Sequence, residues 1–159
     1  MKLPLTWLQT FFDQPLPAVD ELVEIMDGLG LAVEDVTEHP GAPAGVVVVD
    51  VLEVDPIEGS DYLKRTVVTD GASTHQVVCG APVVTVGMRT ALALPGTHLP
   101  AAGGDEGLEV GQREMLGVAS NGMLCSPREL GLYDYAGGLI TFGQDAPLGA
   151  ELSDLWEGE

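Results

Sequence analysis

The chain has 159 residues, of which 45% are hydrophobic and 19% are charged, and its mean hydropathy is +0.22. This length is enough for one domain with a real core, or for one domain with a small partner module. The apolar content excludes general intrinsic disorder. Six Lys and Arg against 25 Asp and Glu give a formal net charge of −19. That balance argues against strong, general binding to nucleic acids or anionic membranes, which requires clustered cations.

The two cysteines and the first residues of the chain predict a cytoplasmic protein. Cys79 and Cys125 are too few for a disulfide scaffold, and we expect them to be buried thiols in a reducing compartment. The opening residues contain no long apolar stretch typical of a secretory signal. No apolar run approaches the roughly 20 residues that cross a bilayer, so no membrane partner is expected.

Residues 1 to 39 predict two short helices and a strand. A Thr-x-x-Gln capping box at residues 6–9 opens the first helix. The second helix should begin near residue 18 and stop at Gly28 or Gly30. Alternating apolar residues predict a strand at 31–36. The buried face of the second helix is expected to contain Val19, Leu22, Val23 and Met26.

Residues 40 to about 150 are rich in Val, Gly and Pro, which favours a small closed β-barrel of short strands. A turn is expected at 70–71, and a loop tip at 103–107. A single helical turn should be capped by Ser126 and closed by Glu129. Strands are expected at residues 45–54, 63–69, 74–79, 89–94 and 139–142.

No catalytic, cofactor or metal site is predicted. The three His and two Cys are dispersed and have no known ligand spacing. Cys125 lies in an apolar run and is expected in the core. Ser120 and Ser126 have no neighbouring His, and the glycine-rich segment 117–122 lacks the Lys of a phosphate loop.

Nucleic-acid binding by a small barrel requires cations beside aromatic stacking platforms. Residues 62–65, Tyr-Leu-Lys-Arg, form the only local cluster of both kinds. Two interpretations remain open for this cluster. It is either a nucleic-acid contact or the solvated start of a strand with Leu63 in the core, and the residues alone favour the strand.

Several segments in order along the whole chain resemble the N-terminal region of the bacterial phenylalanyl-tRNA synthetase beta subunit. The most specific is the Ser-Asn-Gly-Met-Leu-Cys-Ser run at 120–126, followed by Glu-Leu-Gly-Leu at 129–132. The Cys-Gly-Ala-Pro run at 79–82 is nearly as specific. The segments that carry the resemblance are Pro4–Leu8, Gly28–Val36, Val77–Pro82, Leu94–Gly96 and Ser120–Ser126.

The resemblance implies an α+β chain with an OB-type five-stranded β-barrel inserted in a small helix/strand module. The tRNA-binding-type barrel would occupy 40–150. Residues 1–39 would be the first half of the flanking module, and 151–159 the truncated start of its second half. Such a chain would be a fragment of a longer beta subunit, a truncated form of it or a short paralogue.

In this family the enzyme is an α2β2 tetramer that attaches phenylalanine to its tRNA with ATP and Mg²⁺. The alpha subunit holds the aminoacylation site, so the resemblance implies that this piece is inactive alone. It would act as a scaffold and a weak auxiliary tRNA contact. The candidate tRNA-contacting residues are Tyr62, Lys64, Arg65, Arg89, Arg113, Asn121 and Arg128.

The chain departs from the family pattern where the family offers cations. Asp55 stands where a His is usual, and Val83 where an Asn is typical. The segment 109–117 keeps only Arg113 of several Lys and Arg. Two alternatives therefore remain: a stand-alone OB-fold tRNA-binding or chaperone-like protein, and an interaction module that has lost RNA binding. Stand-alone relatives generally lack the opening helices of residues 1–39.

Overall fold

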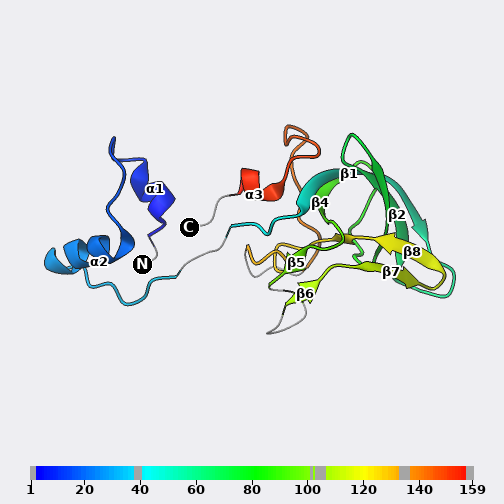
Figure 1. Cartoon of the computed structure of the whole chain (residues 1–159), viewed down its shortest axis with the longest axis horizontal. Helices are drawn as coiled ribbons and strands as arrows, with labels where there is room; N and C mark the ends of the chain where they lie inside the picture. Colours follow the sequence, from blue (N-terminus) through cyan, green and yellow to red (C-terminus); the bar gives the residue numbers. More distant parts are fainter. Residues whose placement is uncertain (1–2, 38–40, 101, 103–106, 133–136, 157–159) are drawn as a thin grey trace. The chain divides into compact units, whose positions relative to one another are not determined.

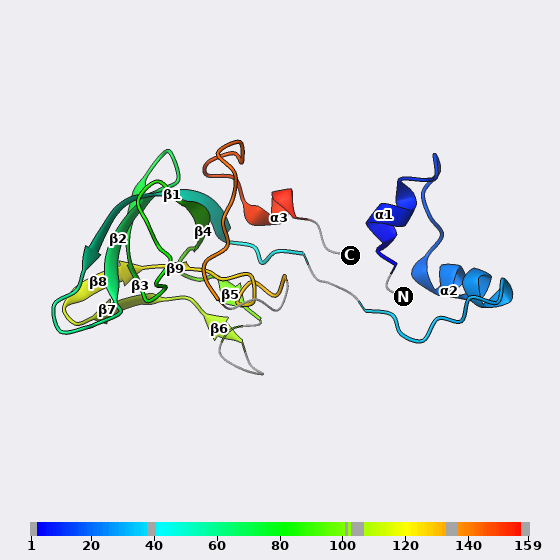
Figure 2. The same ribbon diagram turned by 180° about the vertical axis from the view of Figure 1, so that it is seen from behind.

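The computed structural model describes residues 3–37, 41–100, 102, 107–132 and 137–156. The chain forms two compact units: residues 1–39 with 158–159, called the helical unit here, and residues 40–157, called the barrel unit. Figures 1 and 2 show each unit from two sides. The predicted loop tip lies outside the described residues except for Gly107. None of the described helices is long and apolar enough to cross a membrane.

The first helix of the helical unit, α1 (Leu5–Gln9), starts directly after Pro4 and has no side-chain cap. The predicted capping box is therefore wrong. The Gln9 side chain instead reaches forward: its amide donates to the carbonyls of Phe12 and Gln14, and its oxygen accepts from the Leu16 amide at 2.9 Å. These bonds hold the loop that follows α1, and they keep the Gln9 side chain away from the start of the helix, where a capping box would need it.

The second helix, α2 (Val19–Gly28), lies where it was predicted, and Gly30 adopts a positive φ of 81° just beyond it. The predicted buried face is wrong, because no residue of the helix is buried. The predicted strand at 31–36 is wrong. The described residues offer this segment no partner strand, and its Val33 amide donates to Asp27 Oδ1 at 3.0 Å instead. Its apolar positions therefore remain partly exposed.

Short antiparallel strands build the barrel unit, and four of the five predicted strands are confirmed within two residues. The main sheet has the order β3-β2-β1-β4-β9, and two hairpins, β5–β6 and β7–β8, complete the unit. The strand bounds are β1 (Val46–Pro56), β2 (Lys64–Thr69), β3 (Thr74–Cys79), β4 (Arg89–Ala93), β5 (His98–Leu99), β6 (Leu108–Glu109), β7 (Gln112–Met115), β8 (Val118–Asn121) and β9 (Met123–Leu124). The result is a nearly closed, OB-type β-barrel, as expected.

The first half of β1 is buried on both faces, which explains its unbroken run of four valines. Val47, Val49 and Val51 point into the barrel interior with Leu92 of β4. The opposite face carries Val46 and packs in a second apolar cluster. Other members of that cluster are Leu99, Leu130, Ile140 and Leu152.

The end of the described chain packs on the barrel. Glu151 forms a β-bridge with Val47, and the Val48 amide donates to the carbonyl of Ala150 at 3.0 Å. The short helix α3 (Leu152–Leu155) follows and buries Leu152 completely. Residues up to 152 therefore contribute to the core of the barrel unit.

Side chains rather than a backbone ladder close the barrel between β3 and the β7–β8 hairpin. The Val78 amide donates to Ser120 Oγ at 3.0 Å, and Ser120 in turn donates to the carbonyl of Gly122. Gln76 donates to the carbonyl of Ala119 at 2.9 Å. Gly122 then passes so close to β4 that a Cβ would stand 2.6 Å from the carbonyl oxygen of Ala93, so glycine is required there.

Two local predictions after β9 are corrected by the structure. The predicted strand at 139–142 is wrong, because this segment makes isolated backbone hydrogen bonds instead of a ladder. The Ile140 amide donates to the carbonyl of Cys125, and the Phe142 amide donates to the carbonyl of Arg89. The predicted helix after Ser126 is only a hydrogen-bonded turn. Its capping box nevertheless forms, since Glu129 Oε2 accepts from the Ser126 amide and hydroxyl at 2.6 and 2.7 Å.

Candidate functional site

A groove with a volume of about 790 Å³ lies where β3 ends, between the β7–β8 hairpin and the turn after Ser126. Its lining is mainly apolar. The apolar side chains along it include Leu63, Ala81, Pro82, Met115, Met123 and Leu139. Among the described residues that line it, three carry a formal charge at neutral pH: Arg113, Arg128 and Glu129.

The register of the β7–β8 hairpin determines which charge faces the groove. Arg113 pairs with Ser120 and Met115 with Val118, whereas Glu114 pairs with Ala119. Directly paired residues share one face of a sheet, and neighbours in sequence point to opposite faces. Arg113, Met115 and Ser120 accordingly line the groove, and Glu114 lies on the other face of the hairpin.

The turn at 126–129 places the other two charges. Two hydrogen bonds from Ser126 hold the Glu129 carboxylate, and Ser126 Oγ also accepts from the Glu129 amide at 3.3 Å. Arg128, one residue before, is exposed and lines the groove. The carboxylate is thus engaged within its own turn, while both arginine side chains border the hollow.

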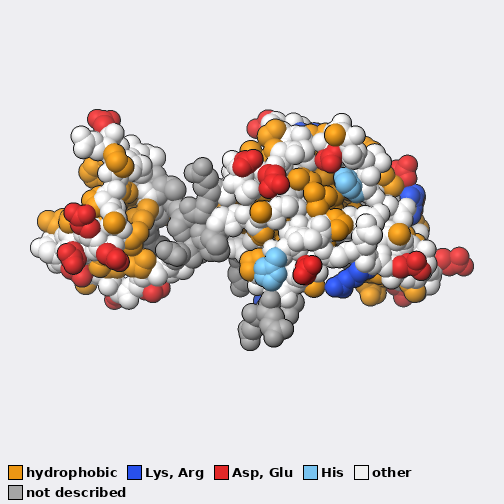
Figure 3. All heavy atoms as spheres, in the orientation of Figure 1, with side chains coloured by type: hydrophobic (Ala, Val, Ile, Leu, Met, Phe, Trp, Pro, Cys, Tyr) orange, Lys and Arg blue, Asp and Glu red, His pale blue; other side chains and the backbone are white. Residues whose placement is uncertain are grey.

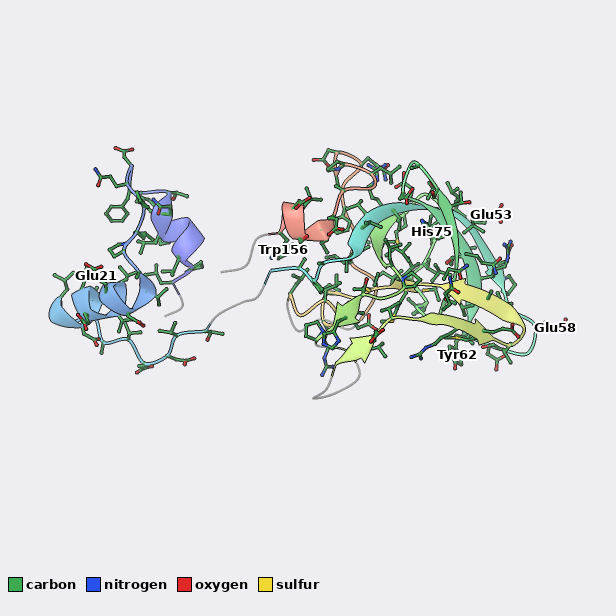
Figure 4. All side chains as sticks on the ribbon, viewed as in Figure 1. Glu21, Glu53, Glu58, Tyr62, His75 and Trp156 are labelled. Carbon is green, nitrogen blue, oxygen red and sulfur yellow. The ribbon has the colours of Figure 1, made fainter. Side chains whose placement is uncertain are left out.

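Tyr62 and Lys64 lie at the rim of the groove. A Cβ on Gly80, which lines the groove, would stand 3.5 Å from the Tyr62 ring, so the ring lies against the Gly80 backbone. Tyr62 is 66% exposed, and Figure 4 labels it at the lower right of the barrel. Lys64 Nζ donates to the carbonyl of Pro82 at 3.1 Å.

Two of the candidate cations lie elsewhere in ion pairs. Arg65 binds the carboxylates of Glu53 and Asp55 on the outer surface of β1. Arg89 makes a two-bond pair with Asp50, with both N–O distances at 2.7 Å. Asn121 lies on the hairpin face opposite the groove, paired with Gln112.

Arg89 also fastens a neighbouring loop. Its Nη1 donates to the carbonyls of Gln144 and Ala146, each at 2.7 Å. The guanidinium of Arg89 therefore connects the first residue of β4 to the Asp50 carboxylate of β1 and to the loop after residue 143. This arrangement raises the pKa of Arg89, chiefly through the hydrogen bond to Asp50, and lowers the pKa of Asp50.

The two cysteines are buried free thiols, as expected. Burial raises the pKa of Cys79, and it raises the pKa of Cys125 to about 12. Both thiols therefore stay protonated near neutral pH, which deprives them of the thiolate needed for nucleophilic attack or metal binding. Among the described residues, no three His, Cys, Asp or Glu side chains gather in a way that could hold a metal ion.

Sequence reasoning missed the β7–β8 hairpin and with it one wall of the groove. Its two-residue turn, Leu116–Gly117, has positive φ at both positions, 51° and 77°. Asn or Gly is the usual signal for such a turn, and an exposed Leu gives no such signal. Gln112 to Met115 contains a single apolar residue, so no apolar alternation marked this strand in the sequence.

Comparison with known proteins places the chain in a family. The family model described as "Putative tRNA binding domain" matches residues 46–151. The chain belongs to this tRNA-binding domain family. The match runs from the first residue of β1 to the bridge between Glu151 and Val47, so the family domain corresponds to the barrel.

The curated relatives are phenylalanine–tRNA ligase beta subunits. That of Rhodospirillum rubrum is 38% identical over 155 residues, covering 98% of this chain and 19% of the relative. That of Nitrosospira multiformis is 39% identical over 163 residues, covering 99% and 19%. The chain thus spans about a fifth of the length of these relatives. A solved MetRS-related protein from Pyrococcus horikoshii is 19% identical, with a TM-score of 0.48 over 87% of this chain and 98% of that one.

Proposed function

We propose that this chain is the N-terminal, non-catalytic module of a phenylalanine–tRNA ligase beta subunit and contacts tRNA weakly through its barrel. The observation that carries the proposal is the family match over 46–151 within a likeness that covers 98% of the chain. In the whole α2β2 enzyme, the alpha subunit would join phenylalanine to tRNA with ATP and Mg²⁺ in the cytoplasm. We assign no step of that reaction to this chain.

The distribution of charge supports a weak tRNA contact at one place. Acidic side chains are scattered over the barrel surface seen in Figure 3, and Lys and Arg are few. Arg113 and Arg128 nevertheless line the same groove, and Lys64 binds Pro82 at its edge. Two or three phosphate contacts give modest affinity, because each contact contributes through the release of counterions.

The helical unit supports the proposal that the chain is part of a larger assembly. Apolar side chains such as Phe11 and Leu29 are 63% and 72% exposed. Large exposed apolar surfaces are typical of interaction sites. We propose that residues 1–39 are the first half of a flanking module whose second half begins after Leu152, because Glu151 and Leu152 pack on the barrel, and that later parts of the beta subunit complete this module.

The test is binding of tRNA specific for phenylalanine to the full 159-residue chain across a salt series. We expect weak binding with a log–log salt slope of roughly −2 to −3, corresponding to two or three phosphates. The variant with both Arg113→Gln and Arg128→Gln should lose roughly two units of that slope. Arg65→Gln is the matched control, because Arg65 does not line the groove and binds Glu53 and Asp55 on the outer surface of β1. Absence of binding at low salt would overturn the tRNA contact and leave a scaffold role.

A further inference from the structure

We propose that the groove binds an unpaired nucleotide of RNA, with its base among the apolar residues beside Tyr62 and its phosphate on Arg113 and Arg128. The proposal rests on the proposed function, in which RNA is the ligand, and adds which part of the RNA enters the site. A helical segment of RNA is the alternative that it excludes.

The lining of the groove suits a base rather than a sugar-phosphate backbone. Leu63, Pro82 and Met115 border it, and its volume of about 790 Å³ lies within the range of small-molecule sites. In a duplex the apolar faces of the bases are stacked on one another, so a helix has only polar groups to offer such a surface. An unstacked base exposes both of its faces and can bury one against apolar side chains.

The exposed Tyr62 ring provides a stacking surface at the groove rim. Gly80 has no side chain, so the ring lies directly against the backbone there, and most of the side chain remains open to solvent. Aromatic rings in this position are the usual platforms for single-stranded nucleic acids, because every base has a π-face. Leu63, the next residue along the chain, lines the groove itself.

The charges near the groove favour a short segment of RNA. Arg113 and Arg128 line the groove, Glu129 is bonded to Ser126, and Glu114 lies on the other hairpin face. The surface beyond is acidic, because the whole chain has a net charge of −19. A duplex brings two rows of phosphates against that surface, whereas one unpaired nucleotide brings a single phosphate to the groove, where two arginines and one carboxylate leave a net positive formal charge. Like-charge repulsion therefore selects against the helix.

The experiment measures binding of two fluorescent RNAs to the full chain by anisotropy, at about 20 mM salt, where screening is weak. One probe is a ten-nucleotide oligoadenylate, and the other is a blunt ten-base-pair duplex. We expect the single strand to bind at least about tenfold more tightly. Deacylated tRNA serves as the reference ligand for the proposed function.

Variants test the location of the site. Tyr62→Leu should weaken binding of the single strand about five- to tenfold, the lower part of the range for a lost stacking contact, and Tyr62→Phe should restore it. Arg113→Gln and Arg128→Gln should each weaken binding by a factor of about three to ten. Arg65→Gln should stay within about twofold, because Arg65 lies outside the groove. Urea midpoints confirm that each variant is folded, which is expected for exposed positions.

The outcomes separate the two proposals. Duplex binding equal to or tighter than single-strand binding overturns this inference and leaves tRNA binding intact. Single-strand binding that none of the three groove variants weakens also overturns it, because the site then lies elsewhere. Failure of tRNA and both oligonucleotides to bind overturns the tRNA contact of the proposed function as well.

Discussion

Apolar residues recur at regular positions in both units of the chain, but among the described residues they are fully buried only in the barrel unit. In the barrel unit, Val46 to Val49 are buried on both faces of one strand. In the helical unit, no described side chain from residue 3 to 37 is fully buried, and Trp7 and Phe11 meet edge to face at 4.9 Å while remaining mostly exposed. Periodicity makes a surface suitable for burial, but burial requires a partner surface, and the helical unit lacks one among the described residues.

The same contrast separates two extended segments. The β1 strand finds β2 on one side and β4 on the other, so its backbone and side chains are both satisfied. The segment 31–36 was also expected to be a strand, but it forms no ladder with any of the described residues. We therefore expect substitutions in the barrel to change stability strongly and equivalent substitutions in the helical unit to change it little.

The largest effect is expected from Leu92→Ala in β4. Leu92 is fully buried in the barrel interior, and removing its side chain should cost about 2–5 kcal/mol of unfolding free energy. Leu29→Ala in the helical unit is the matched control and should change it by less than about 0.5 kcal/mol. Urea unfolding of both variants measures the difference. A comparable loss for Leu29→Ala would show that the helical unit has a core of its own.

A second large effect is expected from Ser120→Ala, which removes the hydroxyl that closes the barrel. The Val78 amide would lose its acceptor in a buried position, at a cost of about 1–3 kcal/mol. Thr37→Ala removes an exposed hydroxyl that bonds only Asp35, and it serves as the control. If thermal unfolding shifts equally little in both variants, side-chain closure is not what holds β3 to β8.

Acid should weaken the barrel through Asp70 in the β2–β3 turn. The amides of Ser73 and Ala72 and the His75 ring bind its carboxylate and lower its pKa to about 2. Because the folded pKa lies below the unfolded value, the stabilisation is present above about pH 4 and is lost as the pH falls towards 2. We expect a loss of about 1–2 kcal/mol, since the group is partly solvated.

The control for this pH dependence is Asp70→Asn, measured by urea unfolding between pH 5 and pH 2 at about 0.1 M salt. The variant should be less stable than the parent at pH 5 and should approach it at low pH. Parallel stability curves for the two proteins would contradict the role of Asp70.

The smallest effect is expected from deleting residues 1–39. The barrel core is built within 40–157, so the shortened chain should keep a cooperative transition within about 1 kcal/mol of the parent. Circular dichroism during urea titration provides the measurement. A shallow transition without a clear midpoint would show that the barrel depends on the helical unit.

Local chemistry made most of the barrel strands predictable from sequence. Runs of β-branched residues are bounded by turn residues, so Thr74–Cys79 was located to the residue and the Asp70–Gly71 turn was confirmed. The β7–β8 hairpin was not predicted, because Leu116 occupies a positive-φ position. The segment 139–142 has the composition of a strand, but β9 takes the place beside β4.

The candidate site was predictable only in part, because it depends on barrel closure. Arg113 and Arg128 are distant in sequence, and both line the groove only once β8 lies beside β3. Lys64 and Arg65 are neighbours in sequence, yet they diverge: Lys64 binds Pro82, and Arg65 binds Glu53. Adjacent residues of a strand point to opposite faces, so a cluster in sequence is not a cluster in space.

The register in which β7 pairs with β8 determines which charged side chains face the groove. A shift of one residue would turn Arg113 outward and bring Glu114 to the groove, reversing the sign of the charge that this wall presents. The Leu116–Gly117 turn fixes that register, so the length of the turn also determines the electrostatic potential of this groove wall. Acidic substitutions on the hairpin face that lines the groove would therefore change the charge of the groove, whereas those on the opposite face would not. For this reason the net charge of the chain alone does not describe what the groove attracts.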